Sequence, residues 1–79
     1  MNIDDIRIFI QREILNDEAI SIADDQDLLL SGLLDSLGVT RLVTHLEEQT
    51  GIEIPAGDVT LENFSSLALI RDYLQTRAA

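Results

Sequence analysis

The chain has 79 residues, of which 15 are acidic and 5 are basic, and its formal net charge is −10 at pH 7. Such a charge disfavours nucleic acid and anionic membranes as partners, whereas a hydrophobic content of 46% is too high for a disordered acidic tail. The length predicts a single domain, residues 1–79, and the absence of cysteine gives no sign of an oxidising compartment. Because no apolar run is long enough for a signal peptide or a membrane span, we expect a cytoplasmic protein.

A first helix is predicted over residues 3–15. Its apolar residues recur at spacings of three and four, as on one face of a helix, and they are Ile3, Ile6, Ile10 and Ile14, with Phe9 beside them. Asn2 is placed to cap this helix, and Asp4 and Asp5 lie in its first turn, where the helix dipole favours negative charge.

The connection that follows, residues 16–34, is long for so small a domain. Two acidic stretches, 16–18 and 24–27, alternate with short apolar segments, and five leucines lie between positions 28 and 34. A connection of this length is unusual unless it is functional or is packed down by its own apolar residues. We therefore expect the leucines to pack this connection against the bundle.

A second helix is predicted from Asp35 or Ser36 to about Thr50, with Gly51 in the position that ends a helix. Projection at about 100° per residue gathers a core stripe that consists of Val39, Leu42, Val43 and Leu46. Leu37 falls on the opposite, exposed side, and around it lie Thr40, Arg41, Thr44 and Glu48. A single exposed leucine is common on protein surfaces and on its own needs no explanation.

The rest of the chain predicts shorter elements and one more long helix. Residues 52–55 alternate for only two periods before a proline, which favours an extended loop with two buried isoleucines. Residues 60–65 predict a short helical turn that holds Leu61 and Phe64 inward. The last helix begins at residue 65 or 66, reaches about residue 76, and has as its core residues Leu67, Ile70, Tyr73 and Leu74. The predicted fold is all-α, a four-helix bundle of three main helices and one short helix with a long first loop.

Three other functional patterns are set aside. His45 lies nine residues after Ser36, about half a turn round the helix and about 13 Å along it, which does not fit a Ser/His/Asp hydrolase site. We expect His45 to be a solvated surface residue. The acidic run 24–27 lacks the glycine and the glutamate of an EF-hand calcium loop, so it predicts a solvated loop and no metal site. The four glycines are scattered and form no phosphate-binding loop.

Asp35 and Ser36 taken alone fit an ordinary helix N-cap, but their surroundings resemble the attachment site of acyl carrier proteins and other phosphopantetheine-binding carriers. The resemblance rests on the string Ser-Gly-Leu-Leu-Asp-Ser-Leu-Gly at positions 31–38. It continues through the apolar spacing of each helix, through residues 51–55 and through residues 64–74. It therefore spans nearly the whole chain, and the combination is far more specific than a lone Asp-Ser-Leu.

The resemblance implies a non-catalytic carrier in which Ser36 receives a 4′-phosphopantetheine arm from coenzyme A and carries acyl, polyketide or aminoacyl cargo as a thioester. Asp35 and Leu37 would flank the attachment point. The implied partners are a phosphopantetheinyl transferase, an acyl- or aminoacyl-loading enzyme and a downstream synthase or transferase, and the carrier itself is expected to be a monomer. The residues agree with this, because a helix N-terminus at Ser36 favours a negative phosphodiester.

Two features differ from carriers of fatty-acid synthesis. Those carriers usually have one residue between the glycine and the aspartate, whereas here Leu33 and Leu34 separate Gly32 from Asp35, as in aminoacyl, D-alanyl or specialised-metabolite carriers. The predicted partner face also carries few acids near the serine, and it consists of Leu37, Thr40, Arg41, Thr44, Glu47 and Glu48. Arg41 places positive charge where basic partners expect negative charge, so ordinary fatty-acid synthase enzymes should recognise this carrier poorly.

The sequence thus predicts a standalone carrier of a specialised acyl, polyketide or aminoacyl pathway. Two alternatives stay open, namely a carrier for ordinary fatty-acid biosynthesis and an unmodified helical interaction domain. The presence of Ser36 disfavours the second alternative, because an unmodified member would be expected to have lost this serine.

Overall fold

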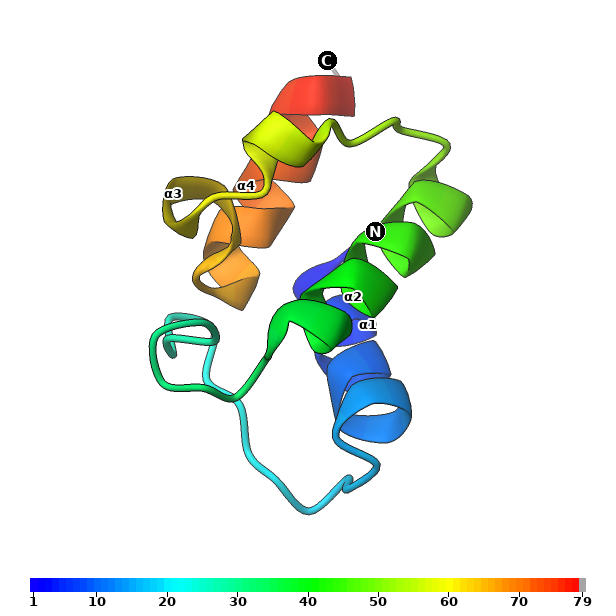
Figure 1. Ribbon diagram of the computed structural model, residues 1–79. Coiled ribbons are helices and arrows are strands. Elements are labelled where there is room, and N and C mark those ends of the chain that lie inside the picture. The colour runs from blue at the N-terminus through cyan, green and yellow to red at the C-terminus, as the bar shows by residue number, and fades with distance from the viewer. Residues whose placement is uncertain (79) are drawn as a thin grey trace.

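Every regular element in the computed structural model, which describes residues 1–78, is helical (Figure 1). In chain order the elements are α1 (Ile3–Phe9), a π-helical turn η1 (Ile10–Ile14), α2 (Ser36–Thr50), a 3₁₀ turn η2 (Ala56–Asp58), α3 (Leu61–Phe64) and α4 (Leu67–Ala78). The predicted all-α fold, with three main helices, one short helix and a long first loop, is confirmed.

Helix α1 begins at the expected cap. The Asn2 side chain accepts a hydrogen bond from the Asp5 N–H at 2.9 Å, and the Asp5 carboxylate accepts one from the Asn2 N–H at 3.4 Å, which completes a capping box. The predicted helix over residues 3–15 is one continuous helical run, but its last turn widens to a π-helix, closed by the Leu15 N–H and the Ile10 carbonyl at 2.8 Å. The additional residue in this turn leaves Leu15 half-buried against the core.

The leucines hold down only part of the long connection. Leu28 and Leu34 are buried as predicted, and Leu29 and Leu33 are half-buried. Leu30, however, is 77% exposed. It lies at the tip of a tight turn that the N–H of residue 32 closes onto the Leu29 carbonyl at 3.1 Å. The expectation was therefore wrong for Leu30, because the turn directs this side chain into solvent.

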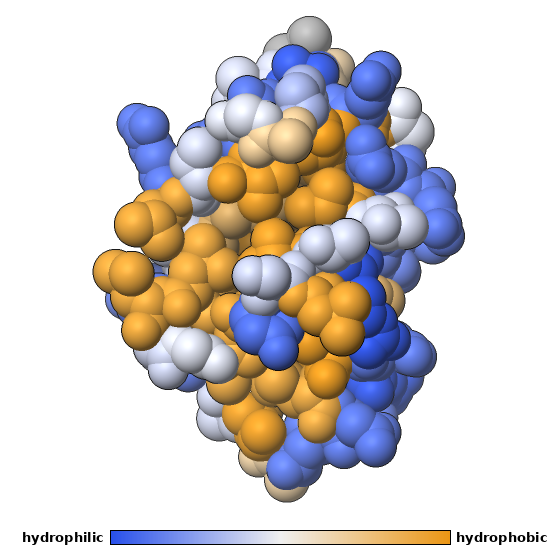
Figure 2. Space-filling view, viewed as in Figure 1, coloured by the Kyte–Doolittle hydropathy of each residue, from blue (hydrophilic) through white to orange (hydrophobic). Residues whose placement is uncertain are grey.

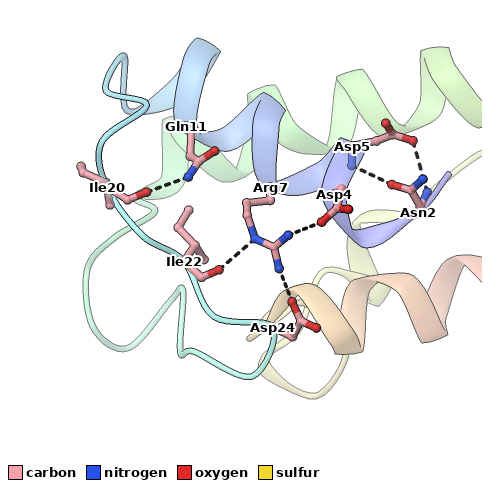
Figure 3. A network of polar contacts seen from close by, with 8 residues as sticks. All are labelled: Asn2, Asp4, Asp5, Arg7, Gln11, Ile20, Ile22 and Asp24. Carbon is pink, nitrogen blue, oxygen red and sulfur yellow. Dashed lines mark hydrogen bonds and ion pairs between the residues drawn. The ribbon is translucent and has the colours of Figure 1, made fainter.

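Polar contacts with α1 and η1 anchor the rest of the connection (Figure 3). The Arg7 Nε donates to the Ile22 carbonyl at 2.9 Å, and the same guanidinium forms an ion pair with Asp24. The Gln11 side-chain amide donates to the Ile20 carbonyl at 2.7 Å. No sequence pattern predicted these contacts, which tie an otherwise irregular segment to the first helical run.

One continuous core lies between the helices. Its buried members are Ile6, Ile10, Ile22, Leu28, Leu34, Leu42, Leu46, Ile54, Phe64, Leu67, Ile70 and Leu74. Helix α2 ends as predicted, because Gly51 adopts the left-handed conformation with a φ of 71° and its N–H donates to the Glu47 carbonyl at 2.9 Å.

Val39 and Val43 of the predicted core stripe of α2 are only half-buried, and three more predicted core positions need correction. Leu61 is 49% exposed, because it is the first residue of a single-turn helix whose inward position is taken by Phe64. Tyr73 is half-buried rather than buried, since its hydroxyl donates to the Asp58 carboxylate at 2.7 Å. Ile52 is also only half-buried. The last helix runs two residues beyond the expected end, to residue 78.

Candidate functional site

Helix α2 begins at a cap that leaves Ser36 as its first residue. The Asp35 Oδ1 accepts a hydrogen bond from the Gly38 N–H at 2.7 Å, and the Asp35 carbonyl accepts one from the Val39 N–H at 2.9 Å. The predicted capping role of Asp35 is therefore confirmed. The Asp35 Oδ1 is thus occupied by the cap hydrogen bond, which stabilises the first turn of α2. Ser36, the next residue, is exposed.

The start of α2 suits a phosphate attached to Ser36. Within the part of the chain that the structure describes, the Ser36 hydroxyl and the N–H groups of Ser36 and Leu37 have no hydrogen-bond partner. Free N–H groups and the positive end of the helix dipole both favour a negatively charged group. The residues present therefore fit the phosphodiester of a phosphopantetheine arm.

Gly38 has a structural role at the start of α2 that sequence reasoning missed. It is buried in the first turn of α2, and a Cβ added there would lie 3.2 Å from the Ile14 Cγ2 and 3.3 Å from the Asp35 Oδ1. The glycine thus allows η1 to approach the start of α2 without disturbing the cap. The sequence did contain a signal for this role, namely a glycine inside a predicted helix. Such a glycine lowers helix stability by about 1 kcal/mol relative to alanine, so its presence indicates close packing at that position.

Apolar side chains are exposed at the start of α2, on the loop before it and on α3. Leu37 is 68% exposed, and Leu30 and Leu61 are exposed as well. Figure 2 shows hydrophobic residues gathered over α3, the loop that precedes α2 and the side of α2 that faces them, with hydrophilic residues along the border. A groove of about 320 Å³ lies along α2, lined by Val39, Thr40, Val43, Thr44, Ile54, Ala56 and Val59.

The threonines and Arg41 of the predicted partner face are all exposed on the outer side of α2. The Thr40 hydroxyl donates to the Ser36 carbonyl at 2.9 Å, and the Thr44 hydroxyl donates to the Thr40 carbonyl at 3.0 Å. Both hydroxyl protons are therefore used within the helix, which leaves Arg41 as the group on this stretch that can donate to a partner.

Of the two predicted acids on this face, only one is free of a structural role. The Glu47 carboxylate is half-buried and accepts a hydrogen bond from the Ile54 N–H at 2.9 Å, which fixes the loop after α2. Glu48 is exposed. The structure therefore places Glu47 toward the loop, while Glu48 lies a little more than three turns from Ser36.

His45 is not the solvated residue that we predicted. It is half-buried, and its ring stacks on Phe9 with the ring centroids 3.8 Å apart and the planes 8° from parallel. The expectation was wrong because the first helical run covers this side of α2.

Within residues 1–78, no three histidine, aspartate or glutamate side chains are grouped to hold a metal ion. None of the described helices combines the length and the apolar content needed to span a membrane.

A small helical bundle that exposes a serine at the start of its second helix has the form of a carrier domain. The family model described as "Phosphopantetheine attachment site" matches residues 9–74. The chain therefore belongs to the family of phosphopantetheine-binding carrier proteins. It is a non-catalytic carrier, and its prosthetic group is 4′-phosphopantetheine.

Two similar proteins are D-alanyl carrier proteins. The one from Streptococcus suis (strain 98HAH33) is 35% identical over 49 residues, or 62% of each chain, so the match covers less than two thirds of that relative. The one from Enterococcus faecalis (strain ATCC 700802 / V583) is 34% identical over 62 residues, covering 78% of this chain and 80% of the relative. A chain in a solved structure described as "Crystal structure of FAD-dependent dehydrogenase" is 29% identical, with a TM-score of 0.79 over 87% of this chain and 97% of that chain.

Proposed function

We propose that Ser36 is the attachment point of the phosphopantetheine arm, with Asp35 and Leu37 flanking it. The observation that carries this proposal is the exposed, unpartnered serine hydroxyl at the capped start of α2. In the attachment reaction the Ser36 oxygen bonds to the phosphorus of the pantetheine phosphate of coenzyme A. The bond from that phosphorus to the adenosine bisphosphate half breaks, and the hydroxyl proton is lost. Residues 1–79 act as one carrier domain, which we expect to be monomeric and cytoplasmic.

The cargo that we propose is an aminoacyl group or a specialised acyl or polyketide intermediate. When bound, the arm supplies the thiol that holds cargo as a thioester, in a chain that has no cysteine of its own. The two D-alanyl carrier relatives support an aminoacyl cargo. Ordinary fatty-acid biosynthesis is the alternative, and it is disfavoured by Arg41 on the partner face.

The solved-structure match favours flavin-dependent oxidation as a second candidate role. Because the alignment covers 97% of the matched chain, that chain is a small bundle of the same kind. It belongs to a structure described as an FAD-dependent dehydrogenase. A carrier of this kind would present its cargo to a flavin dehydrogenase, with FAD as the oxidant, between the loading enzyme and a downstream synthase or transferase.

The attachment proposal is tested by intact-protein mass spectrometry after incubation with coenzyme A and a phosphopantetheinyl transferase. We expect the wild type to gain the mass of one phosphopantetheine and Ser36→Ala to gain none. Ser31→Ala is the matched control, because Ser31 is an exposed serine of the preceding loop, and it should gain the same mass as the wild type. An unmodified wild type, or an equal gain in Ser36→Ala, would overturn the proposal.

The cargo is then tested by loading trials on the modified protein. Adenylating enzymes are offered D-alanine, other amino acids and carboxylic acids, and the acylated carrier is detected by its mass. Aminoacyl or specialised acyl loading supports the proposal, whereas efficient loading only by fatty-acid synthase enzymes supports the alternative. Loss of two hydrogens from the loaded cargo on incubation with a flavin dehydrogenase would establish the second role.

A further inference from the structure

The phosphopantetheinyl transferase is the one partner whose position on this surface follows from chemistry, given the proposed attachment at Ser36. Its active site has to reach the Ser36 oxygen, so the enzyme must cover the first turns of α2. Leu37 is the next residue and is 68% exposed. Arg41 follows five residues after Ser36, about 7.5 Å along the helix axis. The transferase therefore meets an apolar side chain and a cation beside its target.

Arg41 differs from every other arginine of the chain. The other four each form an ion pair with a carboxylate, and the pairs are Arg7 with Asp4 and Asp24, Arg12 with Glu18, Arg71 with Asp72, and Arg77 with Asp58. Arg41 is exposed and has no such pair among residues 1–78. Positions three and four residues away on either side hold no acid, so the helix offers it no intrahelical partner.

No carboxylate among residues 1–78 lies within ion-pair distance of this guanidinium. Between Ser36 and Thr44, Arg41 is the only charged residue. The Asp35 carboxylate caps the helix, and the Glu47 carboxylate accepts from the loop backbone. In a chain with three acids for every base, the one arginine that has no ion pair among residues 1–78 thus lies on the surface that a partner must cover.

We propose that the phosphopantetheinyl transferase acting on this chain docks through an apolar surface that carries a carboxylate opposite Arg41. On the carrier, the docking face consists of Leu37 and Arg41, which are neighbours one helical turn apart on α2. The exposed Leu37 supplies an apolar contact whose burial favours binding, and a guanidinium prefers a carboxylate, which it binds in a bidentate manner. A basic docking surface would instead place like charges together, which penalises the wrong partner.

The test uses one transferase of known structure in two forms. One form has a basic residue at the position that faces the second turn of the carrier helix, and the other has glutamate there. The rate of mass gain with coenzyme A is measured at increasing carrier concentration. We expect the wild-type carrier to be modified with a KM about fivefold lower by the glutamate form. Arg41→Glu should reverse this preference, and Arg41→Gln should abolish it.

Arg71→Glu is the matched control, because it changes the net charge equally but lies on α4 next to Asp72. It should keep the preference of the wild type. Leu37→Ala should raise the KM for both enzyme forms. A wild type that prefers the basic form, or an Arg41→Glu protein with unchanged preference, overturns this inference while leaving attachment at Ser36 intact. If neither enzyme form modifies the wild type or any Arg41 variant, the proposed function itself fails.

Discussion

Gly38 is a residue at which η1 packs closely against the start of α2. A methyl group there would meet the Ile14 Cγ2 at 3.2 Å on one side and the Asp35 Oδ1 at 3.3 Å on the other. Neither neighbour can easily move away from an added methyl group. Ile14 is half-buried against the core, and the Asp35 Oδ1 accepts a hydrogen bond from the Gly38 N–H at 2.7 Å. We expect Gly38→Ala to lower the free energy of unfolding by about 1 kcal/mol, the crowding outweighing the gain in helix propensity.

The same change in an Ile14→Ala background provides the control for this prediction. Removing the isoleucine branch opens space for the new methyl group, so Gly38→Ala should become neutral or stabilising there. Denaturant unfolding of the four proteins measures both effects. If Gly38→Ala lowered the free energy of unfolding equally in both backgrounds, the contact with Ile14 would not be the reason that position 38 requires glycine.

Tyr73 gives stability a dependence on alkaline pH. Burial and then the hydrogen bond to the Asp58 carboxylate raise the pKa of the Tyr73 hydroxyl above its ordinary value of 10.0. The native state therefore holds this proton more tightly than the unfolded state. The resulting stability is fully present below about pH 10 and is lost as the pH rises through the native pKa. The free energy of unfolding of the wild type should accordingly fall above pH 10.

The chain is well suited to this measurement, because it has one tyrosine and no lysine that would titrate in the same range. Tyr73→Phe should lose about 1 kcal/mol near neutral pH through the missing hydrogen bond, and its stability should show no corresponding decline above pH 10. Denaturant unfolding across this pH range, with tyrosinate absorbance to follow ionisation, makes the comparison. A parallel decline in both proteins would contradict the assignment.

At the residue scale, the sequence predicted the residues that cap the helices, but it did not predict most side-chain contacts between different helices. Asn2, Asp35 and Gly51 were assigned correctly because a cap acts within three or four residues of its own position. His45 was misplaced because its partner, the Phe9 ring, belongs to another helix. Periodicity reports which side of a helix faces the core, but it does not report what covers the remaining sides.

At the scale of elements, the segment between the first two long helices depends on Arg7. Its guanidinium binds the Ile22 carbonyl and pairs with Asp24, and the Asp24 carbonyl in turn accepts from the Ala68 N–H of α4 at 3.0 Å. We expect Arg7→Ala to lower the free energy of unfolding by about 1–3 kcal/mol, because a largely buried carbonyl loses its donor and the segment loses its anchor. Limited proteolysis should then cut within residues 16–27.

Arg12→Ala serves as the matched control for Arg7. The Arg12 side chain is 59% exposed and pairs with a Glu18 side chain that is 64% exposed, so its removal should change stability by less than about 0.5 kcal/mol. Thermal unfolding and the proteolysis pattern distinguish the two variants. Equal effects of both substitutions would mean that the ion pairs, rather than the carbonyl contact, hold the segment.

Element boundaries followed from the sequence where a pattern was local. The limits of α2 were predicted within one residue, since both ends carry cap signals. The π-helical turn at residues 10–14 was not predicted, because isoleucines spaced by four fit either kind of helix. The contacts that anchor the long connection could not be predicted either. Arg7 and Ile22 are fifteen residues apart, and every residue has a backbone carbonyl, so the sequence does not indicate which carbonyl Arg7 binds.

At the scale of the whole molecule, the net charge of −10 describes the partner face poorly. The molecule is 33 Å long, whereas charges are screened over about 8 Å at physiological ionic strength. A partner at the start of α2 therefore senses Asp35, Arg41 and the exposed Leu37 more than the acids in the first turn of α1. The resemblance identified the carrier class and Ser36 as the expected site, but only the structure showed which charges near that serine remain unpaired.

This local view predicts how enzymes of ordinary fatty-acid synthesis treat the protein. Their basic docking surfaces should meet Arg41 unfavourably, so acyl transfer to the modified wild type should be slow. Arg41→Glu should accelerate transfer about fivefold by replacing repulsion with attraction. Arg71→Glu, which adds the same negative charge on α4, should leave the rate unchanged. Normal rates for the wild type that Arg41→Glu does not alter would contradict the prediction, and equal acceleration by both variants would show that net charge, rather than the local pattern, governs recognition.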